Sequence, residues 1–204
     1  MQESIKKAIK DYSINADDEA IEKLSTYAKE VIDKNKKINL ISKKDEKNII
    51  ERHIIDSLIV LKFPIADELK NKEIIDIGSG AGFPAIPLSI VLKNARITLS
   101  EQRKKKFFFL IWIKQLLKLE NIRILNQMID KTHNNRYDIA TQRAAARFDD
   151  LYPIVSSLLN EKGIFISWMM EKDLMEIGNN KSPNFIYNYY LSDGVKRVLA
   201  IWRK

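Results

Sequence analysis

The fold is decided by the stretch Ile75-Asp76-Ile77-Gly78-Ser79-Gly80-Ala81-Gly82-Phe83-Pro84, in which an apolar run ends at three alternating glycines. Glycine lets the backbone turn sharply and lets a ligand approach without a Cβ in its path. The spacing is G-x-G-x-G, and Phe83 stands where a dinucleotide-binding loop has glycine or alanine. The stretch therefore predicts a strand, a ligand-binding loop and a helix start, and it disfavours NAD and FAD. A nucleoside with a charged tail that is not a phosphate fits better, and S-adenosylmethionine is such a molecule.

Strand-like and helical segments alternate around and after this loop. We expect strands at 73–77, 96–99, 122–125, 137–141 and 163–168, and helices at 83–92, 103–119 and 151–159. This alternation predicts a parallel sheet with helices on both faces. It breaks near the C-terminus, where two strand candidates, 185–191 and 196–202, flank the turn signal Ser192-Asp193-Gly194. The predicted fold is an α/β, Rossmann-like sheet that ends in an antiparallel β-hairpin at its edge.

The first 62 residues have a helical pattern instead. Apolar residues recur at helical spacing between Ala20 and Ile32, and Asn15 is the expected N-cap. A second amphipathic stretch runs from Ile49 to Leu61, and Pro64 ends it. We therefore expect an N-terminal helical extension at 1–65 and the sheet domain at 66–204.

Composition limits the possible classes of protein. A chain of 204 residues that is 45% apolar and 30% charged is typical of a soluble globular protein with one core. It has no cysteine, which excludes disulfides, thiolate metal sites and a cysteine nucleophile; we expect no metal. The longest apolar run, Phe107–Ile113, is far shorter than the ~20 residues of a membrane span. Without a signal-peptide pattern, we expect a cytoplasmic protein with no membrane partner.

Two acidic residues follow neighbouring strands of the predicted sheet and are candidates for nucleoside binding. Glu101 follows the second strand, where a carboxylate accepts hydrogen bonds from both ribose hydroxyls in this topology. The alternative is a surface glutamate beside a basic run. Asp130 follows the third strand and is a candidate acceptor for an adenine amino group, with Ile129 against the ring. An ordinary polar loop explains that pair equally well.

The net charge of +8 favours an acidic partner, and nucleic acid is the commonest. Basic residues cluster at 34–37, 43–44 and 103–106, and the last cluster lies beside the predicted cofactor edge. A solvated helix face is the alternative for each cluster. The residues that we predict to bind RNA phosphates are Arg103, Lys104, Lys105, Lys106, Arg147 and Arg197. For Arg147 a salt bridge to Asp149 or Asp150 is equally compatible with the sequence.

Four segments together resemble one known family. They are Ile38-Asn39-Leu40-Ile41-Ser42, Arg52-His53-Ile54-Ile55-Asp56-Ser57-Leu58, the glycine loop with its extension to Leu88, and Arg143-Ala144. On these segments, and over nearly its whole length, the chain resembles the bacterial 16S ribosomal RNA guanine-N7 methyltransferases.

The resemblance implies the methyltransferase fold with a seven-stranded sheet, preceded by a helical extension. It implies S-adenosylmethionine as the cofactor, and a guanine in the decoding-region loop of 16S ribosomal RNA, or of a small-subunit precursor, as the substrate. By motif position it implies cofactor contacts from Gly78, Phe83, Ile129, Asp130 and Arg143, and we add Gly80 and Gly82 of the same loop.

Methyl transfer to guanine N7 needs alignment and electrostatics rather than a general base, because N7 carries a free lone pair. Arg143 follows the fourth strand at the open edge of the sheet, so we expect it to position the base or the cofactor. One position departs from the family pattern: many relatives carry lysine at the end of the fifth strand, where this chain has Met169. Lys172 is a candidate substitute.

Two other functions fit the sequence. One is a methyltransferase that acts on a different substrate, and the other is a non-catalytic nucleotide-binding module. We expect a monomer.

Overall fold

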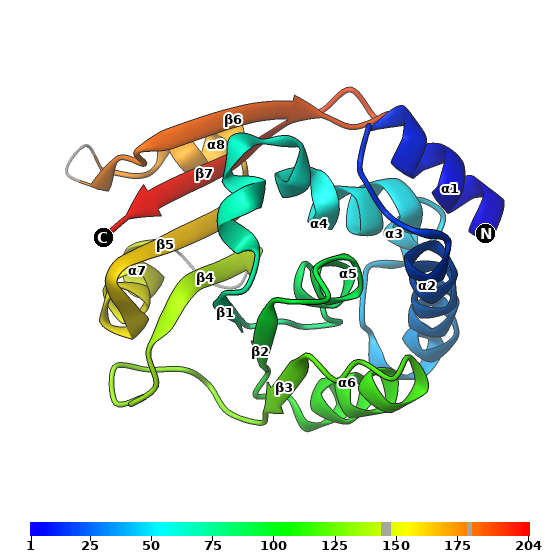
Figure 1. Ribbon diagram of the computed structural model, residues 1–204, viewed down its shortest axis with the longest axis horizontal. Coiled ribbons are helices and arrows are strands. Elements are labelled where there is room, and N and C mark those ends of the chain that lie inside the picture. The colour runs from blue at the N-terminus through cyan, green and yellow to red at the C-terminus, as the bar shows by residue number, and fades with distance from the viewer. Residues whose placement is uncertain (144–147, 179–180) are drawn as a thin grey trace.

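The fold is built on a single seven-stranded sheet with the strand order β3-β2-β1-β4-β5-β7-β6 (Figure 1). The computed structural model describes residues 1–143, 148–178 and 181–204. The strands are β1 (Glu73–Ile77), β2 (Arg96–Ser100), β3 (Ile122–Leu125), β4 (Tyr137–Arg143), β5 (Leu159–Met170), β6 (Phe185–Tyr190) and β7 (Lys196–Arg203).

Strands β1 to β5 are parallel to their neighbours, whereas β7 runs antiparallel between β5 and β6. The predicted α/β sheet with a C-terminal antiparallel hairpin is thus confirmed. Since parallel strands end at the same edge of a sheet, the loops after β1, β2, β4 and β5 meet there, which is where α/β folds bind ligands.

Helices cover both faces of the sheet. Along β1, Ile74 packs into the larger core with α5 (Ala85–Val91) and α6 (Lys104–Leu116), and Ile75 packs into the smaller one with α7 (Phe148–Leu158). Successive strand residues point to opposite faces, which gives the two cores. The short helix α8 (Glu171–Met175) follows β5.

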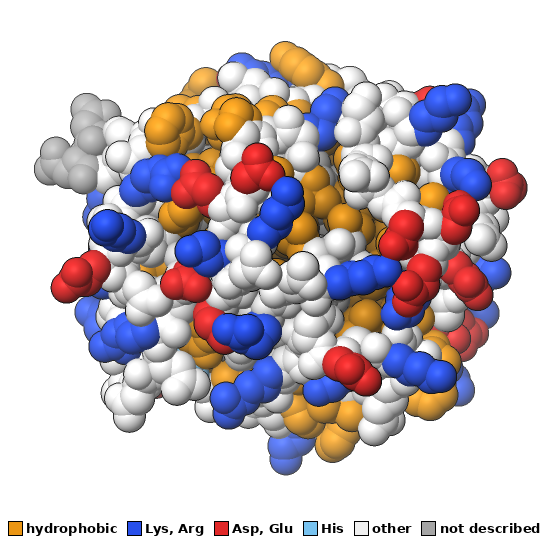
Figure 2. Space-filling model, in the orientation of Figure 1, with side chains coloured by type: hydrophobic (Ala, Val, Ile, Leu, Met, Phe, Trp, Pro, Cys, Tyr) orange, Lys and Arg blue, Asp and Glu red, His pale blue; other side chains and the backbone are white. Residues whose placement is uncertain are grey.

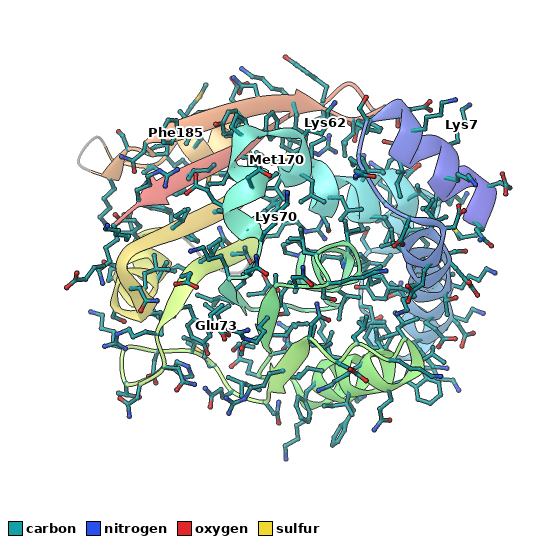
Figure 3. The ribbon with its side chains drawn as sticks, viewed as in Figure 1. Lys7, Lys62, Lys70, Glu73, Met170 and Phe185 are labelled. Carbon is teal, nitrogen blue, oxygen red and sulfur yellow. The ribbon has the colours of Figure 1, made fainter. Side chains whose placement is uncertain are left out.

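The N-terminal extension packs against the same face of the sheet as α5 and α6. Its helical elements are α1 (Gln2–Asp11), α2 (Asp18–Ile38), α3 (Lys43–Glu46), η1 (Ile50–Ile55), α4 (Asp56–Leu58), η2 (Ile59–Lys62) and η3 (Pro64–Leu69). The larger core is one cluster of buried residues that contains both Ile5 of the extension and Ile201 of β7. The extension and the sheet therefore share this core. In Figure 3 the exposed side chain of Lys7 marks α1 on one side of the molecule, and Phe185 marks the start of β6 on the other. The boundary at residue 65 stays a prediction.

Two local expectations for the extension need correction. The N-cap of α2 is Asp17, not Asn15, because the Asp17 carboxylate accepts the N–H of Ala20 at 2.8 Å. The stretch after Ile49 is not one regular α-helix. It passes through a π-helical turn, a short α-helical turn and a 3₁₀ turn. Such π turns occur frequently at functional sites. As expected, the stretch ends before Pro64.

No helix in the described parts of the chain is long and apolar enough to cross a bilayer.

Candidate functional site

The glycine loop forms the floor of a cavity at the carboxyl edge of β1 and β2. Gly78 and Gly80 have φ angles of 69° and 61°, in the left-handed region that glycine favours. A Cβ on Gly80 would find only two atoms within 4 Å, the Gly78 carbonyl oxygen and Lys106 Nζ, both 3.8 Å away. It would therefore take up space within the cavity. The cavity measures about 330 Å³, and its apolar lining consists of Ile77, Met128, Ile129, Leu151 and Ile154.

Glu101 lines this cavity and ties the glycine loop to the start of α6. Its Oε2 accepts the N–H of Gly80 at 2.9 Å, and its Oε1 accepts the N–H of Arg103 at 2.7 Å. The residue is only 5% exposed. A carboxylate offers about four lone-pair positions, so two remain for hydroxyl donors. This position suits the predicted ribose contact, which stays a prediction.

Gly82 and Phe83 belong to the same loop but do not line the cavity. A Cβ on Gly82 would stand 2.5 Å from a side-chain atom of Ile86, so the glycine is required by packing. The Phe83 ring is buried, with its centroid 5.1 Å from the Tyr27 ring and 4.8 Å from the His53 ring. Both residues shape the loop through their packing, and their predicted contact with the cofactor stays a prediction.

The two residues predicted to bind adenine, Ile129 and Asp130, differ in exposure and in whether they line the cavity. Ile129 is buried and lines the cavity. Asp130 is exposed, and its Oδ1 accepts both the N–H and the hydroxyl of Thr132, at 2.8 and 2.6 Å. These hydrogen bonds lower the pKa of Asp130. Asp130 lies outside the lining of the cavity, so its adenine contact also stays a prediction.

The basic residues at the start of α6 lie on the rim of the same cavity. Arg103 and Lys106 line it, while Lys104 and Lys105 are exposed. Partial burial lowers the pKa of Lys106. By contrast, Lys34 of α2 is paired with Asp33 at 3.3 Å. The α6 cluster is therefore better placed for phosphates than Lys34.

A second cavity, of about 620 Å³, lies at the carboxyl edge of β4 and β5. Asp149 lines this cavity and the next residue, Asp150, lines the first one, so the first turn of α7 separates the two. Met169 is part of its wall, whereas Lys172 is exposed on α8 and is not. No contact among the described residues therefore supports the prediction that Lys172 takes the place of the lysine that relatives carry where this chain has Met169.

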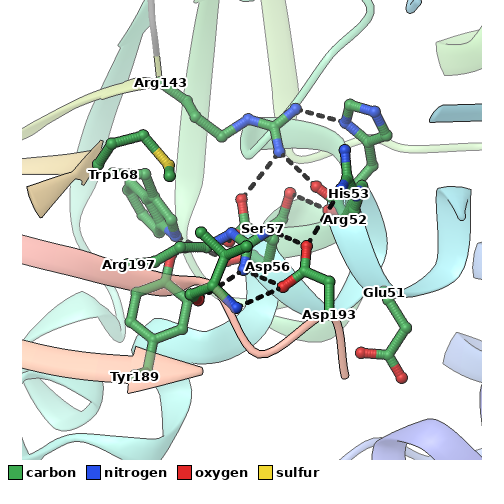
Figure 4. Close-up of polar contacts among 12 residues, drawn as sticks. Glu51, Arg52, His53, Asp56, Ser57, Arg143, Trp168, Tyr189, Asp193 and Arg197 are labelled. Carbon is green, nitrogen blue, oxygen red and sulfur yellow. Dashed lines mark hydrogen bonds and ion pairs between the residues drawn. The ribbon is translucent and has the colours of Figure 1, made fainter. Parts of the chain in front are cut away.

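One wall of the second cavity is a buried polar network around Asp56 (Figure 4). The Asp56 carboxylate accepts Arg143 Nη1 at 3.0 Å and the Tyr189 hydroxyl at 2.7 Å, and Arg197 Nε lies 3.8 Å away. Its main-chain carbonyl accepts the Trp168 indole N–H at 2.7 Å. Because these four partners come from β4, β6, β7 and β5, one residue of the extension is linked to four strands, three of them through its carboxylate and β5 through its carbonyl.

Arg143 lies at the second cavity, as expected for a residue after β4, but its guanidinium already has several partners. It donates to the Arg52 carbonyl at 3.0 Å, its Nη2 lies 2.6 Å from His53 Nδ1, and it sits 5.2 Å from the Phe83 ring centroid. The structure therefore shows Arg143 linking the extension to the sheet. Its role toward the base or the cofactor stays a prediction.

The other two predicted RNA-binding arginines have different outcomes. Arg197 forms an ion pair with Asp193 at 2.6 Å, and its side chain is 12% exposed. A paired and largely buried guanidinium is a poor phosphate ligand, so the surface contact predicted for Arg197 lacks support. Arg147 lies outside the residues that the structure describes.

Burial raises the pKa of an aspartate near the first cavity and lowers the pKa of a histidine at the second. Desolvation raises the pKa of Asp76, at the end of β1, to about 6. Thr141 donates to one oxygen of this carboxyl, and the other oxygen has no partner among the described residues. Desolvation, with the Arg143 charge, lowers the pKa of His53 to about 3. The imidazole is neutral near pH 7, and its Nδ1 is the acceptor for Arg143.

Comparison with known proteins decides the family. The family described as "rRNA small subunit methyltransferase G" matches residues 20–192. Proteins of that name include one from Oceanobacillus iheyensis, 31% identical, with 84% of this chain and 74% of the relative aligned. Another, from Aquifex aeolicus, is 38% identical over 70% of this chain and 72% of the relative. The chain belongs to the rRNA small subunit methyltransferase G family.

Solved structures support the methyltransferase fold of this family member. TrmN from Thermus thermophilus superposes with a TM-score of 0.58 at 13% identity, over 76% of this chain and 53% of that one. The ribosomal protein L11 methylase from Lactobacillus delbrueckii subsp. bulgaricus gives 0.55 at 19% identity, over 73% and 77%. At such identities the likeness concerns the fold alone.

Sequence reasoning missed the contacts of Asp56 with Tyr189 and Trp168. Asp56 was noted only as part of the Arg52–Leu58 segment that carries the family resemblance. Its partners lie 87 to 133 residues away in sequence, so no local spacing of residues predicts these contacts. The signal in the sequence is a charged residue inside the mainly apolar stretch 54–61, which requires a partner if it is buried.

Among the described residues, no group of three or more acidic, histidine or cysteine side chains is arranged to hold a metal ion.

Proposed function

We propose that this chain transfers the methyl group of S-adenosylmethionine to N7 of a guanine in 16S ribosomal RNA. Membership of the family supplies the methyltransferase activity and the small-subunit rRNA substrate. The observation that carries the proposal is the pair of adjoining cavities at the carboxyl edge of the sheet, separated by the first turn of α7. One is suited to a nucleoside and the other is large enough for a base.

The cavity at the glycine loop is the proposed site of the cofactor. Gly78 and Gly80 bring bare backbone to its floor, and Glu101 presents the remaining lone pairs of its carboxylate to ribose hydroxyls. Ile129 and Ile154 supply apolar surface for an adenine ring. When bound, S-adenosylmethionine supplies an electrophilic methyl group on a sulfonium. The fit rests on these residues, each of which lines the cavity.

The larger cavity is the proposed site of the target guanine. Trp168, Phe148 and Met169 offer apolar surface there, and Arg143 lies at its wall. Since Arg143 is fixed by Asp56 and by the Arg52 carbonyl, it lies in one position before any substrate arrives. A fixed cation orients a base through its O6 edge without reorganisation, which is the form of catalysis that alignment and electrostatics provide.

No side chain in the Asp56 network is set to act as a general base. The low pKa of His53 makes it a weak proton acceptor, and its Nδ1 faces Arg143. Asp56 already receives hydrogen bonds from Arg143 and Tyr189. A reaction at N7 requires no proton removal, so this arrangement suits that chemistry.

The test is methyl transfer from labelled S-adenosylmethionine to 16S ribosomal RNA, offered as free transcript and as assembled small subunits, followed by nucleoside analysis. We expect label in 7-methylguanosine. Label in another nucleoside or in protein would support the alternative of a different substrate. Cofactor binding without transfer to any of these would support a non-catalytic module. A rate that rises tenfold per pH unit through neutrality would contradict the mechanism without a base.

A further inference from the structure

The outer face of α6 carries an exposed row of large apolar side chains that the proposed cavities do not use. Phe108 is 64% exposed, Trp112 is 45% exposed and Leu116 is 39% exposed. Their spacing of four residues places them one above another on consecutive turns, so the row is about 12 Å long. Single exposed apolar residues are ordinary on a surface, but a continuous row of them is not.

The surroundings of this row are basic. The stretch 102–119 contains six basic residues and no acidic one: Arg103, Lys104, Lys105, Lys106, Lys114 and Lys118. Lys104 precedes Phe108 by one helical turn, and Lys34 of α2 lies with its Nζ 5.8 Å from the Trp112 ring centroid. In Figure 2 hydrophobic and basic side chains lie next to each other over the part of the surface where Figure 1 shows α6.

The acidic residue that contacts the row is already engaged. Glu30 accepts the Trp112 indole N–H at 3.1 Å and lies 3.7 Å from Lys34 Nζ. This contact holds the indole against α2, and the net charge beside the row stays positive. Lysine is depleted in protein–protein interfaces, whereas rings set among cations are typical of surfaces that bind single-stranded nucleic acid.

We propose that the face of α6 formed by Lys104, Phe108 and Trp112 binds a single-stranded segment of the RNA substrate, with bases stacked on the two rings and phosphates held by the lysines. The surface begins next to the proposed cofactor cavity, because Lys104 directly follows Arg103, which lines that cavity. RNA held along α6 thus leads toward the methyl donor. This inference rests on the proposed function, which supplies the identity of the bound RNA.

The test compares binding of a labelled 16S ribosomal RNA transcript by the wild type, Phe108→Ser, Lys104→Gln and the matched control Tyr190→Ser. Tyr190 is 57% exposed on β6 and has no part in the proposed surface. We expect Phe108→Ser to weaken binding about 5- to 100-fold, the range that one stacked base provides. Tyr190→Ser should bind as the wild type does.

Salt dependence distinguishes the two kinds of contact. Stacking releases no counterions, so Phe108→Ser should lower the affinity by the same factor at every salt concentration. Lys104→Gln should reduce the log–log slope by about 0.7 if it neutralises one phosphate of a single strand. Unchanged affinity and unchanged slope in these variants, with normal thermal unfolding, would overturn the proposal.

A further measurement separates this inference from the proposed function. Affinity for S-adenosylmethionine should be the same in Phe108→Ser as in the wild type, since Phe108 does not line the cavity. If the wild type methylates the RNA and Phe108→Ser binds and methylates equally well, the function stands and the surface is refuted. If no variant methylates RNA but Phe108→Ser still loses RNA binding, the surface stands and the function fails. A wild-type dimer that Phe108→Ser dissociates, with RNA affinity retained, would assign the row to self-association and would overturn the proposal.

Discussion

The two cavities at the edge of the sheet are built on different principles. The glycine-loop cavity is made of backbone and of residues that follow neighbouring parallel strands. The Glu101 carboxylate stabilises it by accepting hydrogen bonds from two main-chain N–H groups. The larger cavity is held by side chains that meet at Asp56 from four strands and the extension. A site of the first kind is defined by local sequence. A site of the second kind exists only when distant parts of the chain have packed together, so binding and stability are coupled there.

The largest effect that this difference predicts is the loss of the Asp56 carboxylate. Asp56→Ala leaves the charged Arg143 buried without its partner, and removing one partner of a buried ion pair costs about 3–5 kcal/mol. We expect denaturant unfolding to show a loss of that size. Arg143→Ala should also lower stability, because it leaves Asp56 without its nearest charged partner.

The second prediction compares two glycines of the same loop. Gly82→Ala forces a Cβ into Ile86, Leu110 and the Tyr27 hydroxyl, at a φ of 104°. Overpacking and backbone strain together cost about 2–4 kcal/mol. Gly80→Ala has open space for its Cβ, so it should cost only about 1–2 kcal/mol of stability from its left-handed φ.

Gly80→Ala should instead weaken S-adenosylmethionine binding, because its Cβ occupies the cavity. Unfolding curves and calorimetry on both variants check this contrast. A Gly80→Ala protein with wild-type affinity would remove the loop from the cofactor site.

The third prediction concerns pH, where the two regions should act in opposite directions. Asp76 has its folded pKa raised to about 6 from 3.8, so its stabilising contribution is complete below pH 3.8 and is lost as pH rises through 6. At about 1.4 kcal/mol per unit, that loss reaches about 3 kcal/mol. His53 has its folded pKa lowered to about 3 from 6.5, so its contribution is present above pH 6.5 and is lost as pH falls toward 3.

Unfolding measured between pH 4 and 8 tests both groups. Asp76→Asn should stabilise the protein above pH 6 relative to the wild type, and His53→Gln should reduce the loss of stability on acidification. If both variants show the pH profile of the wild type, the burial of these groups does not control their protonation in the way described.

The last prediction concerns cofactor affinity, rather than stability, and its dependence on Glu101. Glu101→Ala removes hydrogen bonds to ribose hydroxyls that are worth about 1.5–3 kcal/mol each, and Glu101→Gln keeps the shape while removing the charge. Calorimetry with S-adenosylmethionine should show a graded loss, larger in Glu101→Ala. Equal affinity in all three proteins would confine Glu101 to its structural contacts with Gly80 and Arg103.

The sheet and the glycine-loop cavity could be predicted because their determinants are local. The run from Ile75 to Pro84 contains both the strand and the turn, and Glu101 follows the neighbouring strand at the same edge. The Asp56 network could not be predicted, because Tyr189 and Trp168 become its partners only through the strand order. Likewise, the exposure of Phe108 and the burial of Phe109 follow from the packing of α6, although both lie in one run of phenylalanines.

The position of β7 constrains the order in which the sheet can assemble. Residues Lys196–Arg203 lie between β5 and β6, so β6 reaches the rest of the sheet only through a strand that comes later in the chain. We therefore expect Tyr189 of β6 to meet Asp56 only after β7 has paired with β5. The folding nucleus can form from the earlier parallel strands, whereas closure of the larger cavity depends on contacts between residues more than a hundred positions apart. Contacts of such long range are slow to form, so we expect the larger cavity to be completed last during folding.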